Sequence, residues 1–137
     1  MVNKEELLIT TYGGPSIGKV DILFEEKLCT FDYTILKMKF NESCNPYFMT
    51  MLLRSKFIQN QIRYLIKGTT GITFVIPNEI LDIYIPIINK ETQDKIGEVY
   101  KKSLDNIKTS KILIQQAKQD IEDLIEGNFD MSKINEN

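Results

Sequence analysis

The sequence contains no histidine and no tryptophan, and it has only two cysteines and four prolines in 137 residues. The absence of histidine excludes Ser-His and Cys-His catalysis and any zinc site with a histidine ligand, if the chain acts alone. Two cysteines are too few for a zinc site or a disulfide framework. We therefore expect Cys29 and Cys44 to be small buried side chains without a chemical role.

Long apolar runs are also absent, since none approaches the roughly 18 residues of a membrane span. The start of the chain, from Met1 to Glu6, lacks the charged-then-apolar pattern of a signal peptide. With 42% hydrophobic and 26% charged residues, the composition is typical of one folded domain with an added element. We therefore expect a folded cytoplasmic protein with no membrane partner.

Charge is distributed unevenly, although the formal net charge is only -2. Residues 33–76 carry six lysines and arginines against one acid, a net charge of +5. Residues 91–137 carry seven lysines against ten acids, a net charge of -3. The basic middle permits a binding face for a polyanion on one side of the protein. An ordinary solvated face that is rich in lysine is the alternative.

Hydrophobic periodicity predicts an α+β fold with a small, β-rich first part. Apolar residues at intervals of three and four follow Asn45, which should cap a helix that starts at Pro46 and stops at Gly68. We expect a bulge near Leu36 in the third strand. The expected strands are Leu7–Thr11, Lys19–Phe24, Thr30–Phe40, Ile72–Ile76 and Ile83–Ile88.

The last third, from Glu91 to Glu126, has no proline and one glycine, and it predicts one long helix. About 35 helical residues extend roughly 50 Å, which is longer than the preceding domain should be wide. An apolar repeat close to 3.5 residues favours a coiled coil with a second copy or another protein, against packing on its own domain. The expected oligomerisation residues are Ile96, Tyr100, Ile107, Ile114, Ala117, Ile121 and Leu124. We divide the chain into a domain (1–88), a helix (89–127) and a frayed polar tail (128–137).

Two motifs suggest chemistry, but the surrounding sequence does not support it. The glycine-rich stretch 13–19 follows a strand like a phosphate-binding loop, yet its spacing is wrong and no helix follows. Residues 45–48 resemble the Asn-Pro-Pro-Tyr/Phe signature of amino-methyltransferases, but no cofactor-binding glycine loop precedes them, and helix capping explains them better. The sequence thus predicts no catalytic residues, no metal ligands and no cofactor. A non-enzymatic binding or assembly role is favoured.

Several segments lie in an order and at a spacing that is more specific than any one of them. They are Leu7–Val20, Asn45–Ser55, Gln59–Ile62, Gly68–Gly71, Ile80–Pro86 and Gln93–Ile96. Together they resemble the target recognition domain of the specificity (S) subunit of type I restriction-modification systems. The resemblance covers nearly the whole chain.

This resemblance implies sequence-specific binding of double-stranded DNA, with methylation and cleavage carried out by separate subunits. It also implies that the long helix pairs antiparallel with a second helix and docks the methyltransferase (modification) subunit. The family's usual subunit has two recognition domains and two such helices. This chain resembles the latter part of one domain plus one helix, so it should be a truncated chain, a split gene product or a half-subunit. A half-subunit would act as a homodimer on a palindromic target.

For DNA contacts, residue types favour polar and basic side chains in turns. Thr69 and Thr70 lie between two glycines and can approach a groove, while Lys19, Arg63 and Lys67 can reach phosphates. The alternative for this turn is a helix end followed by a strand. The alternative function is an oligomerising coiled-coil adaptor that binds a protein partner and not DNA. A small enzyme would need a metal or a cofactor.

Overall fold

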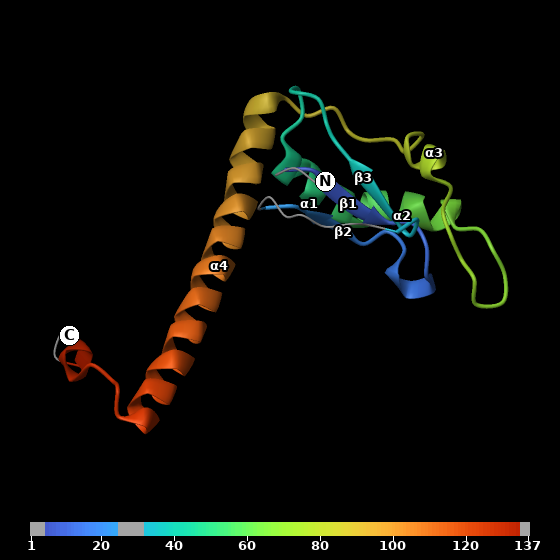
Figure 1. The fold of residues 1–137 in the computed structure, drawn as a ribbon. Coiled ribbons are helices and arrows are strands. Elements are labelled where there is room, and N and C mark those ends of the chain that lie inside the picture. The colour runs from blue at the N-terminus through green and yellow to red at the C-terminus, as the bar shows by residue number, and fades with distance from the viewer. Residues whose placement is uncertain (1–4, 25–31, 135–137) are drawn as a thin grey trace. The chain divides into compact units, whose positions relative to one another are not determined.

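The computed structural model describes residues 5–24 and 32–134, and the chain divides into two compact units, Met1–Lys101 and Lys102–Asn137 (Figure 1). The described elements are β1 (Leu7–Thr10), the 3₁₀ helix η1 (Gly14–Ser16), β2 (Val20–Ile22), β3 (Ile35–Met38), α1 (Pro46–Arg54), α2 (Lys56–Leu65), α3 (Pro77–Ile80), α4 (Lys90–Glu126) and the 3₁₀ helix η2 (Met131–Ile134). Strands and helices are thus mixed, and the α+β class and the long final helix are confirmed. The boundary between the units lies inside α4, after Lys101.

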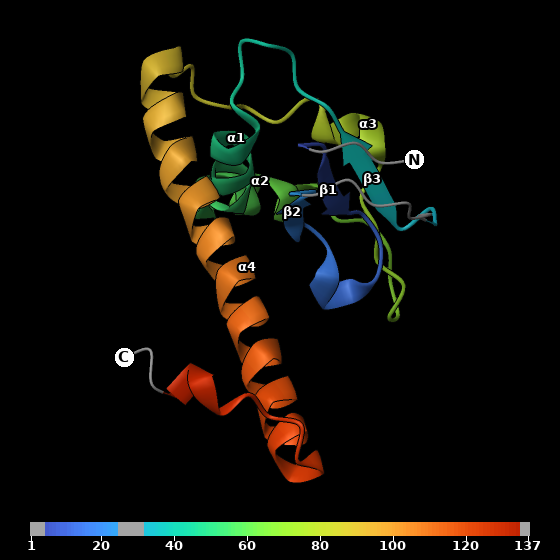
Figure 2. The ribbon, with the colours of Figure 1, turned by 60° about the vertical axis from the view of Figure 1, so that its left-hand side comes forward.

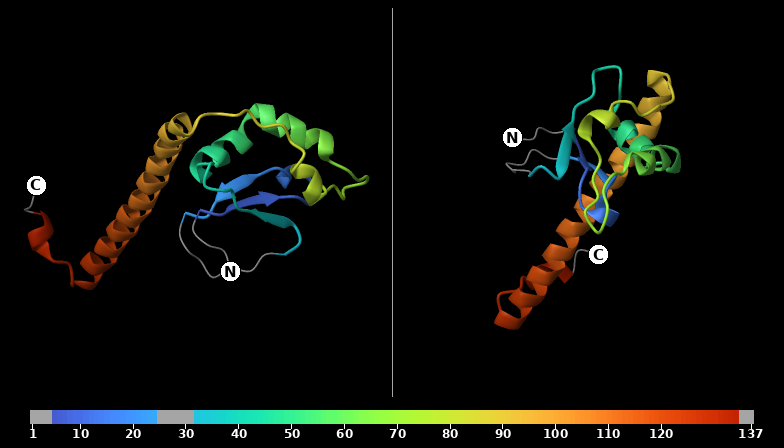
Figure 3. Two further views of the ribbon diagram at one scale, coloured as in Figure 1. Left: turned by 90° about the horizontal axis from the view of Figure 1, so that it is seen from above. Right: turned by 90° about the vertical axis from the view of Figure 1, so that its right-hand side faces the viewer.

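The sheet has three antiparallel strands in the order β2-β1-β3. Leu7 of β1 lies opposite Ile22 of β2 and Met38 of β3. Because side chains alternate along a strand, Leu7 and Ile9 share one face, and both are almost completely buried. Helices α1 and α2 cover this face (Figure 3). The core of the first unit therefore lies between one sheet face and two helices.

Two details of the strands differ from expectation. The predicted bulge near Leu36 is absent, because β1 and β3 pair without interruption from Thr10 opposite Ile35 to Leu7 opposite Met38. β2 and β3 are also shorter than the predicted strands Lys19–Phe24 and Thr30–Phe40, since they span Val20–Ile22 and Ile35–Met38. Residues 30 and 31 of the predicted third strand, and Cys29, lie outside the described residues. Cys44 is described and is only half-buried.

The predicted single helix from Pro46 to Gly68 is wrong, because Ser55 divides it into α1 and α2. Asn45 does cap α1, since its side-chain oxygen accepts hydrogen bonds from the N–H groups of Tyr47 and Phe48 at 3.0 Å. Ser55 has an extended backbone and accepts a bond from the Ile58 N–H with its hydroxyl. Serine is a favoured N-cap because its hydroxyl satisfies a free N–H of the first turn. The break therefore starts a new helix on the same core.

The predicted strands Ile72–Ile76 and Ile83–Ile88 are also wrong. Phe74 makes only isolated bridges, to Tyr12 and to Lys67. Pro77 then begins α3 directly, which fits the preference of proline for the first helical position. In the second segment the Tyr84 backbone bonds to a side chain of α2 instead of to a strand. Both segments are apolar and β-branched, but neither joins the three-stranded sheet, so neither forms a strand.

The first turns of α4 pack within the first unit. The Asn45 N–H donates to Gln93 Oε1 at 3.0 Å, and Asn45 Nδ2 donates to Asp94 Oδ1 at 2.8 Å. Gly97 permits this approach, because a Cβ built there would lie 2.3 Å from Asn45 Oδ1. Hydrogen bonds from Lys90 and then from Asn45 hold the pKa of Asp94 below its usual value. One asparagine thus caps α1 and binds the start of α4.

The second unit consists of the rest of α4 and the residues that follow it. The tail was expected to fray, but Met131–Ile134 form η2, and Lys133 Nζ lies 3.0 Å from Asp120 Oδ1. The hydrogen bond from Lys133 lowers the pKa of Asp120, and Gln116 contributes further. Residues 135–137 of the tail lie outside the described residues.

Candidate nucleic-acid interface

Two glycine-containing turns that are distant in sequence lie side by side in the first unit (Figure 2). One joins β1 to β2 and contains η1, and the other follows α2 at Gly68–Gly71. The Gly13 N–H donates to the Thr73 carbonyl at 3.2 Å, and the Gly14 N–H donates to Thr73 Oγ1 at 3.1 Å. These bonds fix the first turn to the segment that leaves the second.

The second turn requires its first glycine. Gly68 has a φ of 109°, and a Cβ built there would lie 2.1 Å from the Ile72 carbonyl oxygen. Thr70 also has a positive φ, of 53°, which is uncommon for a residue other than glycine. The chain thus closes tightly on itself and holds the two threonines at an exposed tip. The alternative interpretation of Gly68–Gly71 was a helix end followed by a strand. The helix α2 ends before this turn, because its C-cap is Ile66.

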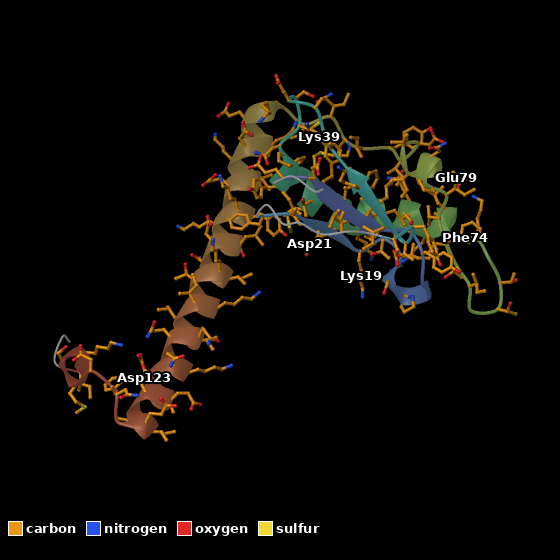
Figure 4. The ribbon with its side chains drawn as sticks, in the orientation of Figure 1. Lys19, Asp21, Lys39, Phe74, Glu79 and Asp123 are labelled. Carbon is orange, nitrogen blue, oxygen red and sulfur yellow. The ribbon has the colours of Figure 1, made fainter. Side chains whose placement is uncertain are left out.

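Lys19 follows the first turn, and the two threonines lie at the tip of the second. Lys19 is exposed, and its carbonyl accepts a bond from the Thr10 N–H at 3.0 Å, which holds its backbone against β1. Its side chain lies beside η1 (Figure 4) and lines an open hollow of about 580 Å³ with Thr10, Val20 and others. The hydroxyls of Thr69 and Thr70 form no hydrogen bond within the described part of the chain. All three side chains can therefore meet a ligand.

The other two predicted contacts have different surroundings. Arg63 is exposed in the last turn of α2, at the entrance to the second turn. Lys67 is already engaged, because its ammonium contacts both carboxylate oxygens of Glu79 on α3. A phosphate would have to compete with this carboxylate for Lys67. We therefore define the candidate DNA-binding site without Lys67. It consists of Lys19, Arg63, Thr69 and Thr70, and we call it the two-turn surface.

Arg54 is an important residue that sequence reasoning did not single out. Its Nε donates to the Val20 carbonyl at 2.8 Å, its Nη2 lies 3.1 Å from Asp21 Oδ1, and its Nη1 donates to the Tyr100 hydroxyl at 3.0 Å. The guanidinium also lies 5.5 Å from the centre of the Tyr100 ring. This network joins α1, β2 and α4 within the first unit. These partners lie on other elements, so no local sequence signal marked Arg54.

Tyr100 was predicted as an oligomerisation residue, and the structure places it in this internal network. Burial raises the pKa of its phenol, and the positive charge of Arg54 partly offsets that rise. The other predicted residues of the α4 seam are exposed. Their relative exposures are 45% for Ile96, 50% for Ile107, 55% for Ile114, 56% for Ile121 and 53% for Leu124, and Ala117 is exposed as well.

Comparison with known proteins gives no relative, since neither a protein-family model nor a curated protein matches the sequence. Among residues 5–24 and 32–134, no helix is both long and apolar enough to cross a membrane. The same residues contain no group of three or more cysteine, aspartate or glutamate side chains that could hold a metal ion.

Proposed function

We propose that this chain binds duplex DNA in a sequence-specific way, as the specificity component or half-subunit of a type I restriction-modification system, and directs separate methyltransferase and nuclease subunits. One observation carries the proposal: the turn that precedes Lys19 is hydrogen-bonded to Thr73, in the segment that follows Thr69 and Thr70 about 50 residues along the chain. The family resemblance of the sequence supports the same function.

The basic residues and the threonines of the two-turn surface suit different parts of DNA. Lys19 and Arg63 neutralise phosphates, and such contacts orient a protein on DNA without reading sequence. Thr69 and Thr70 offer hydroxyls and backbone groups at a narrow tip, which suits contact with base edges. A hydroxyl can donate and accept, so it serves either edge of a base pair. The protein would therefore use charge for affinity and the threonine tip for selectivity.

The proposed homodimer rests on the second unit. Its apolar seam is half-exposed, and its charges are separated along the helix. Residues 102–118 carry four lysines against one acid, whereas residues 119–126 carry four acids and no base. An antiparallel pair of copies brings each basic part beside an acidic part, while a parallel pair stacks like charges. A two-fold pair would present two recognition units to a symmetric target.

The test is enrichment of a random duplex library by the purified protein, with and without a methyltransferase subunit, at low and moderate salt. A recovered motif supports the proposal, and its symmetry reports on the helix pairing. Lys19→Ala should make the plot of log affinity against log salt concentration less steep by about one, as expected for the loss of one phosphate contact. Lys39→Ala removes the same charge from another part of the unit (Figure 4) and should leave the slope unchanged.

The exposed seam of α4 equally suits the alternative, an adaptor that binds a protein partner through this helix. No enriched motif with the methyltransferase present, together with saturable binding of a protein through α4, would favour the adaptor. An unchanged salt slope for Lys19→Ala would remove Lys19 from the interface.

A further inference from the structure

A second candidate site lies in the first unit between α2, α3 and the segment that follows α3. It is an open hollow of about 240 Å³, which we call the tyrosine hollow. Its lining residues are Gln61, Tyr64, Leu65, Glu79, Asp82, Ile83 and Tyr84. Tyr64 and Tyr84 are 91% and 82% exposed. Exposed tyrosines that share one hollow are typical of binding surfaces, because the ring offers a large contact area with few rotatable bonds.

The tyrosine hollow is held in place by a two-point clamp. Gln61 Nε2 donates to the Tyr84 carbonyl at 2.9 Å, and the Tyr84 N–H donates to Gln61 Oε1 at 2.9 Å. Gln61 lies on α2, one turn before Tyr64. The clamp therefore fixes the segment that carries Tyr84 to the helix that carries Tyr64. A site formed before binding loses less conformational freedom when its ligand arrives.

The charge of the tyrosine hollow selects the kind of ligand. Glu79 is neutralised by its ion pair with Lys67. The Asp82 carboxylate has no hydrogen bond or ion pair within the described residues, and no basic residue is among the lining side chains. Aromatic faces carry negative charge density, so two rings and one free carboxylate favour a cation. A phosphate would be repelled, which separates this site from the two-turn surface.

We propose that the tyrosine hollow binds an arginine side chain of a partner protein. A guanidinium is planar, so it stacks on a tyrosine ring while its N–H groups form paired hydrogen bonds with a carboxylate. Leu65 and Ile83 provide apolar contact for the aliphatic part of the side chain. Glu79 at α3 and Lys19 beside η1 lie in different parts of the unit (Figure 4). The protein can therefore hold a protein partner at the tyrosine hollow without covering Lys19.

The test uses the ¹⁵N-labelled full chain and a blocked Gly-Gly-Arg-Gly-Gly peptide. Titration should shift the amide signals of Tyr64, Ile83 and Tyr84 in a saturable way. The same peptide with citrulline keeps the shape of arginine but has no charge, and it should bind at least about tenfold more weakly, a difference of about 1.4 kcal/mol. Equal binding of the two peptides, or shifts confined to other residues, would overturn the proposal.

Asp82→Asn is the decisive variant, because it removes the charge and leaves an exposed side chain of the same shape. It should weaken the arginine peptide about tenfold and bring it level with the citrulline peptide. Glu42→Gln, an exposed carboxylate outside the tyrosine hollow, is the matched control and should bind as the wild type does. Undiminished arginine binding by Asp82→Asn would contradict the proposal. Motif enrichment from the DNA library should be unchanged in Asp82→Asn, so the two proposals fail separately.

Discussion

The two units use the same kind of residue in opposite ways. In the first, Leu7 and Ile58 have no exposed surface, because the sheet and the helices α1 and α2 cover them. In the second, Ile107 and Ile114 recur with comparable regularity along α4, yet half of each side chain remains exposed. A helix with one apolar stripe needs a second surface to bury it. The first unit therefore buries its apolar residues within the chain, whereas the apolar stripe of the second is left exposed.

The sharpest test of this comparison is a large-to-small change in each unit. Ile58→Ala leaves a cavity in a packed core and should lower the free energy of unfolding by about 2–5 kcal/mol. Ile112→Ala removes a side chain that is 59% exposed and should change it by about 0.5 kcal/mol or less. Urea denaturation followed by circular dichroism measures both. Similar losses in the two variants would show that the units do not differ in this way.

The second test addresses association through α4. Ile114→Asp places a charge on the exposed seam, where desolvation on pairing is costly, and should raise the dimer dissociation constant at least about tenfold. Light scattering at tens of micromolar should then give the monomer mass, while the wild type gives the dimer mass. Lys39→Asp in the first unit is a control that changes an exposed charge outside α4 and should leave the dimer mass unchanged. A monomeric wild type at this concentration would contradict the proposed homodimer.

The third test compares the side-chain caps of α1 and α2. Asn45→Ala removes an oxygen that accepts two N–H bonds and an amide that binds Asp94, and it should cost about 1–2 kcal/mol. Ser55→Ala removes a single longer bond, at 3.4 Å, and should cost less. Thermal unfolding of both variants measures the difference. An equal or smaller effect at Asn45 would mean that its second bond, to α4, adds nothing.

The smallest expected effect is on pH dependence. The pKa of Asp94 is lower in the folded protein than in the unfolded chain. The contribution of Asp94 to stability is therefore fully present above the unfolded-state pKa, and it is lost as the pH falls through the folded-state pKa. Asp94→Asn should therefore flatten the acid side of the stability curve, below about pH 4. Urea titrations at pH 3 and pH 7 measure this slope. Because Asp94 is on the surface, the difference should be slight, and a steeper acid limb in the variant would contradict the assignment.

Local signals in the sequence predicted the elements that need no distant partner. The cap at Asn45 and the length of α4 follow from capping and periodicity, which act over a few residues. The predicted strands at 72–76 and 83–88 failed because a strand exists only when another backbone pairs with it. Phe74 forms only two isolated bridges, and the Tyr84 carbonyl accepts a hydrogen bond from the Gln61 side chain.

For the candidate sites, too, the sequence predicted local features but not contacts between distant residues. Lys19, Thr69 and Thr70 were chosen from the sequence as turn residues, but nothing in it indicated that their turns adjoin. The sequence indicated neither the contacts of Arg54 nor the tyrosine hollow, because both depend on residues of other elements. The sequence by itself determined the long helix α4, its apolar stripe and the cap at Asn45. Only the tertiary structure decided which turns meet, which cations are free and which aromatic rings share a hollow, because those depend on contacts between residues far apart in the chain.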